Sequence, residues 1–262
     1  MKRQARADRA FTLLELLVVI GIIAVLASMG VGALRGFNAT NAVAAGNRQL
    51  LDDLNMARNY ALGHRTTVYM VFLPVLRDVG AIGAGLTADQ KRVLTNRVTG
   101  QLTSYNFITK HAPGDQPGQG TIRFLSEWKS LPNGVYISTN EFVVMPPQLW
   151  AAAALTPQGT NLPMTYYPFR FPTINSPVTN LLPCVAFNFR GELLGPTNGV
   201  PRRVDEYIRL TRGSIIYPEL GGPTSVFASP ETIETPRGNS TNNPFIRIDW
   251  ITGRARLQEP SI

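Results

Sequence analysis

The stretch that decides the fold is residues 10–34, AFTLLELLVVIGIIAVLASMGVGAL, an apolar run that contains a single carboxylate, Glu15. From Leu16 to Leu34 there are nineteen residues without a charged side chain. At about 1.5 Å of helix rise per residue, that length is enough to cross a hydrocarbon core of roughly 30 Å. The sequence therefore predicts a membrane-spanning helix over residues 11–35.

The charges around this run have two physical interpretations. A short basic leader precedes it, with Lys2, Arg3, Arg6 and Arg9 opposed only by Asp8. An unpaired carboxylate inside a membrane span costs about 2.5–3.5 kcal/mol, so a positive partner for Glu15 is expected. In the alternative interpretation, Glu15 lies close enough to the start of the span to reach the headgroups at modest cost.

The basic leader, Phe11, Thr12, the Leu-Leu-Glu sequence that ends at Glu15 and the apolar span together resemble a type IV prepilin or pseudopilin. The resemblance implies that a prepilin peptidase removes residues 1–10 by cutting between Ala10 and Phe11, and then methylates the new amine of Phe11. The residue before the cut is usually glycine in that family, and here it is alanine. An ordinary secretory signal is cut after its apolar region and loses it, whereas a prepilin keeps its span.

The same resemblance implies the partners and the location. Glu15 is expected to pair with the N-terminal amine of a neighbouring subunit as a filament assembles. The expected partners are the prepilin peptidase, other pilins or pseudopilins of the filament and the inner membrane. The protein is expected to cross the inner membrane once, with its C-terminal domain in the periplasm, and to join a filament after assembly.

The distribution of prolines predicts one long helix from residue 11 to residue 63. All 20 prolines lie at or after Pro74, and a proline inside a helix costs roughly 3 kcal/mol. Apolar residues recur at helical spacing over residues 37–63, which predicts an amphipathic half that packs on a domain. The stripe consists of Val43, Leu50, Leu54, Ala57 and Ala61, and the residues expected on the other faces are Asn47, Arg48, Asp52, Asp53, Asn55 and Asn59.

Residues 50–73 resemble the helix end and first strand of the GspH/FimT group, the minor pseudopilins of type II secretion and minor type IV pilins. The matching residues are Leu54, Ala57, Arg58, Ala61, Arg65 and Val68. The segment Phe187-x-Phe189-Arg190-Gly191 resembles a hairpin of the same group.

The rest of the chain, residues 64–262, reads as a β-rich domain. Seven segments are rich in Val, Ile, Phe and Tyr and are bounded by Gly or Pro, namely 66–73, 102–109, 121–125, 134–138, 184–189, 206–218 and 244–257. The last of them turns at Thr252-Gly253, which predicts a closing hairpin. The predicted fold is α+β and pilin-like, with the long helix packed on an antiparallel sheet.

Three Pro-rich stretches are interpreted as surface insertions, partly ordered at best: residues 76–100, 139–183 and 218–244. The first of them contains a predicted short helix over residues 88–98.

The sequence offers little from which to build an active site. His64 lies at a predicted helix end and His111 in a Gly/Pro loop. These two histidines and the single cysteine do not have the spacing of metal ligands. Cys184 is the only cysteine, and its apolar surroundings favour a buried, inert thiol. Asp52 and Asp53 are adjacent on a helix and face different directions. We therefore expect a protein that is not an enzyme and that binds no cofactor and no metal.

One C-terminal motif offers a second function. Gly253-Arg254-Ala255-Arg256 matches a Gly-Arg-x-Arg motif through which some FimT-like minor pilins bind DNA during uptake. On a strand, Arg254 and Arg256 point to one face and could contact adjacent phosphates, with Arg237 and Arg247 as possible additions. The alternative is a solvated strand face, which the mildly basic charge of the processed chain favours: 21 basic and 16 acidic side chains, a net of +5.

The leading hypothesis from the sequence is a minor pseudopilin, a non-enzymatic, membrane-anchored subunit of a type II secretion pseudopilus or a type IV pilus that supports protein secretion. The alternative is a FimT-like minor pilin that binds DNA for uptake through Arg254 and Arg256.

Overall fold

The computed structural model describes residues 13–76, 82–111, 115, 120, 122–142, 164–195, 199–217 and 230–260, and the side chains of 28–41, 240 and 241 lie outside this description. The chain divides into two compact units, Met1–Asn41 and Ala42–Ile262.

In the first unit, the described residues belong to helix α1 (Leu13–His64), whose bounds lie close to the predicted 11–63. The large apolar side chains from Leu13 to Leu26 are exposed, with fractions between 42% and 82%. Among the residues that the structure describes, none forms a helix both long enough and apolar enough to cross a membrane.

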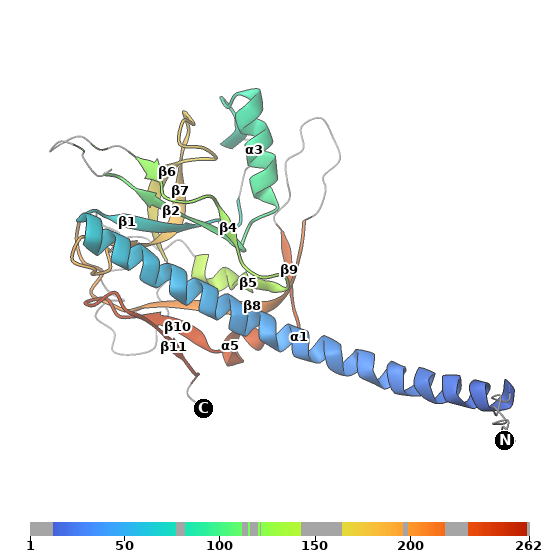
Figure 1. Cartoon of the computed structure of the whole chain (residues 1–262). Coiled ribbons are helices and arrows are strands. Elements are labelled where there is room, and N and C mark those ends of the chain that lie inside the picture. Colours follow the sequence, from blue (N-terminus) through green and yellow to red (C-terminus); the bar gives the residue numbers. More distant parts are fainter. Residues whose placement is uncertain are drawn as a thin grey trace, which may run out of the picture. The chain divides into compact units, whose positions relative to one another are not determined.

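The second unit contains two antiparallel sheets (Figure 1). In the first sheet, β1 (Val68–Phe72) pairs with β2 (Ser104–Thr109) on one side and with β7 (Thr179–Phe187) on the other. The outer strand β6 (Thr165–Arg170) pairs with β7. Two short strands, β3 (Arg123–Phe124) and β4 (Lys129–Ser130), both pair with the far side of β2.

The second sheet is built around β8 (Glu206–Ile216). Its order is β11 (Ala255–Gln258), β10 (Phe245–Ile248), β8 and β5 (Val135–Ile137), and β9 (Glu231–Glu234) pairs with the end of β8. The described residues of this unit also form two short helical turns, η1 (Thr139–Phe142) and α5 (Asn239–Asn242). The predicted α+β arrangement of a long helix and antiparallel sheets is confirmed.

The main core lies between α1 and the two sheets. All five residues of the predicted helical stripe are buried, and each is at most 8% exposed. They pack with apolar residues of both sheets, among them Met70, Phe107, Val185, Ile208, Leu210, Ile246 and Ile248. The amphipathic half of α1 thus contributes one wall of the domain core, as its 3.6-residue period predicts.

A second core lies on the opposite face of the first sheet and includes helix α3 (Ala88–Val98). A capping box starts this helix, because the Thr87 side chain accepts from the Gln90 N–H and the Gln90 side chain accepts from the Thr87 N–H. Leu94 and Val98 then pack under the sheet. Since β1 is covered on both faces, all five of its residues are buried, and its sequence VYMVF shows no alternation.

The interpretation of three stretches as surface insertions is corrected wherever the structure describes them. Four residues of 76–100, namely Leu76, Leu86, Leu94 and Val98, belong to the second core. The stretch 139–183 contains all of β6 and the start of β7, and 218–244 contains β9 and α5. The sequence pattern did not indicate these strands because they contain prolines, which are unfavourable in the middle of a sheet. Pro168 lies in the outer strand β6, and Pro183 lies just before the part of β7 that pairs with β1.

Candidate functional site

Glu15 lies in the first turn of α1, between exposed leucines. A carboxylate is stabilised in the first turn of a helix, because the unpaired N–H groups at that end carry a partial positive charge. The predicted cleavage site, Ala10 and Phe11, lies outside the described residues. The pairing of Glu15 with a neighbour's amine stays a prediction.

The closing hairpin of β10 and β11 forms where the sequence predicts it. In its turn, the Asp249 carboxylate accepts from the Thr252 N–H (2.7 Å) and the Thr252 hydroxyl (2.8 Å). The hydrogen bond from the Thr252 N–H is the main reason that the pKa of Asp249 lies below its usual value. Gly253 completes the turn in the left-handed region, with φ of 61°, which glycine adopts without strain.

This turn packs against two other segments of the domain. The Arg58 guanidinium of α1 donates from Nε to the Thr252 carbonyl at 2.6 Å. A Cβ atom on Gly253 would lie 2.0 Å from the carbonyl oxygen of Gly191, in the turn after β7. Arg58, one of the residues on which the GspH/FimT resemblance rests, therefore fastens the helix to the hairpin in this chain.

The hairpin presents its arginines on one side. Arg254 and Arg256 are exposed, and Ala255 between them is buried, as strand alternation requires. Arg247 lies opposite Arg256 in the register, and an ion pair of 2.6 Å joins it to Asp205. The hydrogen bond to Asp205 is the main reason that the pKa of Arg247 is raised.

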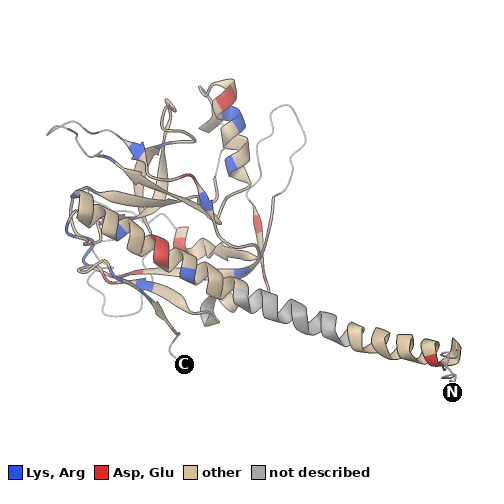
Figure 2. Cartoon of the chain, in the orientation of Figure 1, with Lys and Arg blue, Asp and Glu red and all other residues tan. Residues whose placement is uncertain are grey.

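These arginines line a cleft of about 380 Å³ together with Asp249, Thr252, Leu257 and Gln258. All residues that line the cleft belong to the hairpin. The ribbon of this hairpin carries basic positions, drawn blue in Figure 2. Arg237 follows β9 and is not among the described residues that line it. The structure thus places Arg247, Arg254 and Arg256 along one cleft.

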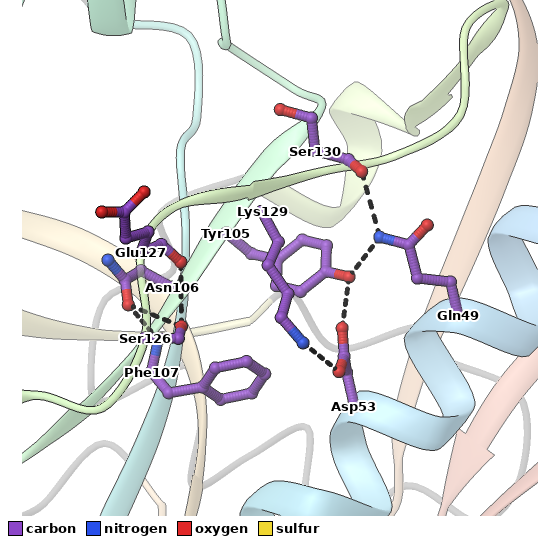
Figure 3. A network of polar contacts seen from close by, with 9 residues as sticks. All are labelled: Gln49, Asp53, Tyr105, Asn106, Phe107, Ser126, Glu127, Lys129 and Ser130. Atoms are coloured by element: carbon purple, nitrogen blue, oxygen red, sulfur yellow. Dashed lines mark hydrogen bonds and ion pairs between the residues drawn. The ribbon is translucent and has the colours of Figure 1, made fainter.

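A polar network, which the sequence analysis missed, joins α1 to the first sheet (Figure 3). Asp53 is 7% exposed and accepts from the Tyr105 hydroxyl (2.6 Å) and from Lys129 Nζ (2.6 Å). Gln49 donates to the Tyr105 hydroxyl (2.7 Å) and to the Ser130 carbonyl (3.0 Å). Burial first, and the hydrogen bond to Asp53 second, raise the pKa of Tyr105.

The expectation that Asn47 and Asp53 lie on faces of α1 other than the one that packs on the domain is wrong. Asn47 is 2% exposed, and its side-chain amide donates to the Pro244 carbonyl (3.4 Å). The spacing contained the signal, because each of the two residues lies three positions before or after Leu50 and so shares its face of the helix. The sequence-based interpretation assigned them to the other faces because they are polar.

Replacing Asp53 with alanine should destabilise the domain by about 1–3 kcal/mol, because the buried Tyr105 hydroxyl loses its acceptor. The Lys129–Asp53 ion pair is partly open to water, since the Lys129 side chain is 38% exposed, and Asp53 keeps its hydrogen bond from Tyr105 in Lys129→Met. This substitution should therefore cost less than about 1 kcal/mol. Chemical unfolding of the full-length protein in detergent, followed by tryptophan fluorescence, measures both.

The double variant Asp53→Ala/Tyr105→Phe is the control. It should be more stable than the sum of its single variants predicts, because neither partner is left unpaired. Strict additivity would show that the Tyr105–Asp53 hydrogen bond contributes nothing.

A second polar cluster, buried except for the partly exposed Arg209, links the two sheets. Arg202 forms an ion pair with Glu206 at the start of β8 and donates to the Thr165 hydroxyl of β6 (3.1 Å). Arg209 approaches Glu141 of η1 at 3.5 Å. Burial raises the pKa of Glu206 to about 8 and that of Glu141 to about 7, against the opposing effects of Arg202 and Arg209, respectively.

The remaining candidate groups have ordinary surroundings. Cys184 is fully buried, and burial is the main reason that its pKa is raised, which keeps the thiol protonated. His64 ends α1 and stacks on Tyr60, with 3.9 Å between ring centroids. Within the described parts of the chain, no three His, Cys, Asp or Glu side chains are placed to hold a metal ion.

Comparison with known proteins gives one match. No curated protein and no solved structure matches the chain. Residues 5–31 match the family described as "Prokaryotic N-terminal methylation motif", a stretch that contains Ala10, Phe11 and Glu15. The motif supports a processed, type IV pilin-like or pseudopilin-like subunit with a membrane-anchored N-terminus, and implies processing by prepilin peptidase and assembly with other pilins. The chain thus carries a type IV prepilin-like N-terminal methylation signal.

Proposed function

We propose that this protein is a minor pseudopilin of the GspH/FimT group, a non-enzymatic subunit of a type II secretion pseudopilus or a type IV pilus that supports protein secretion. The observation that carries the proposal is the methylation motif at residues 5–31. The described architecture is consistent with it, since a single helix, α1, contributes both exposed apolar residues in the first unit and a buried stripe in the second.

The proposed mechanism is assembly. The span over residues 11–35 stores the subunit in the inner membrane, with residues 64–262 in the periplasm. After cleavage, the exposed leucines, isoleucines and valines of α1 pack against the helices of neighbouring subunits. Glu15, in the first turn, sets the register by pairing with a neighbour's methylated amine.

Intact-mass analysis of the protein extracted from membranes tests this proposal directly. The mature chain should begin at Phe11 and carry one added methyl group. Ala10→Trp should abolish the cut because the bulky side chain does not fit where a small residue is required, and Ala10→Gly should leave processing intact or speed it. A mature N-terminus downstream of Leu34 would end the pseudopilin proposal, because the anchor would be lost.

A second candidate function rests on the cleft of the C-terminal hairpin. Because Arg247, Arg254 and Arg256 line one cleft, they could contact neighbouring phosphates of DNA, as a FimT-like uptake pilin would require. The Arg247 charge is already engaged by Asp205, which leaves Arg254 and Arg256 as the principal contacts.

Salt-dependent DNA binding separates the two functions. If Arg254 and Arg256 each contact a phosphate, the log–log dependence of affinity on salt should have a slope of about −2, and each Arg→Gln change should reduce it by about one unit. The exposed Arg48 of α1, changed to Gln, is the matched control. We expect that DNA binding does not depend on Arg254 and Arg256, and that the double variant Arg254→Gln/Arg256→Gln enters filaments normally. A salt-sensitive affinity for DNA that this double variant loses would instead assign the protein to DNA uptake.

A further inference from the structure

A second cleft, of about 470 Å³, lies away from the arginine hairpin. The end of α3, the segment from β4 to β5 and the end of β8 surround it, and its lining includes Arg97, Trp128, Leu131, Gly134, Ile215 and Tyr217. The Tyr217 hydroxyl donates to the Gln101 carbonyl (3.2 Å), which ties the end of β8 to the segment before β2. The volume lies within the range of about 300–1,000 Å³ that is typical of ligand sites.

One edge of β8 is open in this cleft. Backbone groups of successive strand residues point to opposite edges. The Gly213 N–H points to the β5 edge, where it donates to the Gly134 carbonyl at 2.9 Å, whereas the Arg212 carbonyl accepts from Thr235, next to β9, at 3.0 Å. The N–H and C=O of Ile215 therefore point to the β5 edge, two residues past Gly213. Strand β5 begins at Val135, opposite Arg212, so no described strand pairs with β8 at that edge beside Ile215.

Two side-chain donors line the same cleft. Arg97 Nε and the Trp128 indole N–H are buried and have no hydrogen-bond partner among the described residues. The two side chains stack, with 5.4 Å between the Arg97 guanidinium carbon and the Trp128 ring centroid. Arg97 is the one charged residue among those described as lining the cleft, and the nearby Glu127 lies outside that lining.

We propose that this cleft binds an extended segment of a partner protein, which adds as a strand to the open edge of β8 at Ile215 and places an acidic side chain against Arg97. The open N–H and C=O of Ile215 supply main-chain hydrogen bonds, the source of affinity in strand addition. The positive charge of the lining and its two unpartnered donors call for acceptor groups, and a carboxylate satisfies both requirements. Leu131 and Ile215 offer apolar contacts to the alternate side chains of such a strand.

The test uses the full-length protein in detergent and a fluorescein-labelled eight-residue peptide that alternates valine with glutamate and threonine. Fluorescence anisotropy should show saturable binding. A peptide N-methylated at its central backbone nitrogens should bind about tenfold more weakly, because it cannot donate to the strand edge. A peptide with lysine in place of glutamate should bind about tenfold more weakly, and Arg97→Gln should remove that difference.

Two variants of β8 complete the test. Ile215→Pro removes the edge N–H and should weaken binding about tenfold, whereas Ile215→Val keeps the N–H and should bind normally. Should Ile215→Pro fail to fold, the N-methylated peptide still decides the question. The absence of saturable binding, or equal binding of the N-methylated peptide, would overturn the proposal. A third result would also overturn it: no peptide binds, but the chain self-associates and Arg97→Gln abolishes that self-association. The cleft would then be an interface between copies of the chain.

Discussion

At a pH above about 8, where Glu206 is ionised, Arg202→Met is expected to lower the free energy of unfolding by about 3–5 kcal/mol, because it leaves a buried carboxylate without its cation. Glu206 is 1% exposed and Arg202 is its ion-pair partner, so water cannot replace the guanidinium without opening the packing between the sheets. Chemical unfolding of the full-length protein in detergent measures the loss.

The neighbouring Arg203 is the matched control. Its side chain is exposed, and Arg203→Met should change the free energy of unfolding by less than about 0.5 kcal/mol. Equal, small effects of the two substitutions would mean that the Arg202–Glu206 pair contributes nothing net to the fold.

The same cluster makes stability depend on pH. An ordinary glutamate titrates near 4.5, and burial raises the pKa of Glu206 to about 8. Between these values the folded state holds a proton that the unfolded chain has lost, so unfolding releases a proton and stability falls as pH rises from about 4.5 to about 8. Glu141, whose pKa is raised to about 7, acts in the same direction over the lower part of this window. Glu206→Gln cannot ionise and should flatten the slope, whereas an unchanged slope would mean that Glu206 is not its source.

Glu15→Ala is expected to abolish entry into filaments while membrane insertion and cleavage continue. In the native chain, pairing with a neighbour's amine relieves the cost of about 2.5–3.5 kcal/mol that an unpaired carboxylate has in a membrane span. Glu15→Ala has no carboxylate and therefore loses this driving force for assembly, which should reduce incorporation about a hundredfold. Incorporation is measured by co-purification with partner pilins and by the amount of protein in sheared filaments.

Two further variants separate pairing from a merely tolerated charge. Glu15→Val should fail to incorporate in the same way, and Glu15→Asp, which keeps the carboxylate on a shorter side chain, should retain part of the incorporation. If Glu15→Ala and Glu15→Val enter filaments as the native chain does, Glu15 only reaches toward the headgroups and sets no register.

Where side chains repeat at the period of one element, the sequence alone was enough. The stripe from Val43 to Ala61 predicted the buried face of α1, because apolar residues at helical spacing have one way to leave water together. The bounds 88–98 of α3 and the hairpin turn at Thr252-Gly253 were likewise local, set by helix propensity and by turn chemistry. Glu15, Arg254 and Arg256 could be named as candidate site residues for the same reason, since a motif is a local pattern, and their roles stay predictions.

The tertiary structure alone decided which strands are neighbours and which polar groups are buried. Strand β1 pairs with β2 on one side and, on the other, with β7, which follows it by more than a hundred residues in the chain. The sequence also did not indicate that β6 and β7 can accommodate their prolines, Pro168 and Pro183. Asp53 meets Tyr105 and Lys129, and Arg202 meets Glu206 and Thr165, only after the helix and both sheets have packed. A periodic pattern states which face of an element avoids water, but the partner of a buried charge depends on long-range packing that no local window of sequence contains.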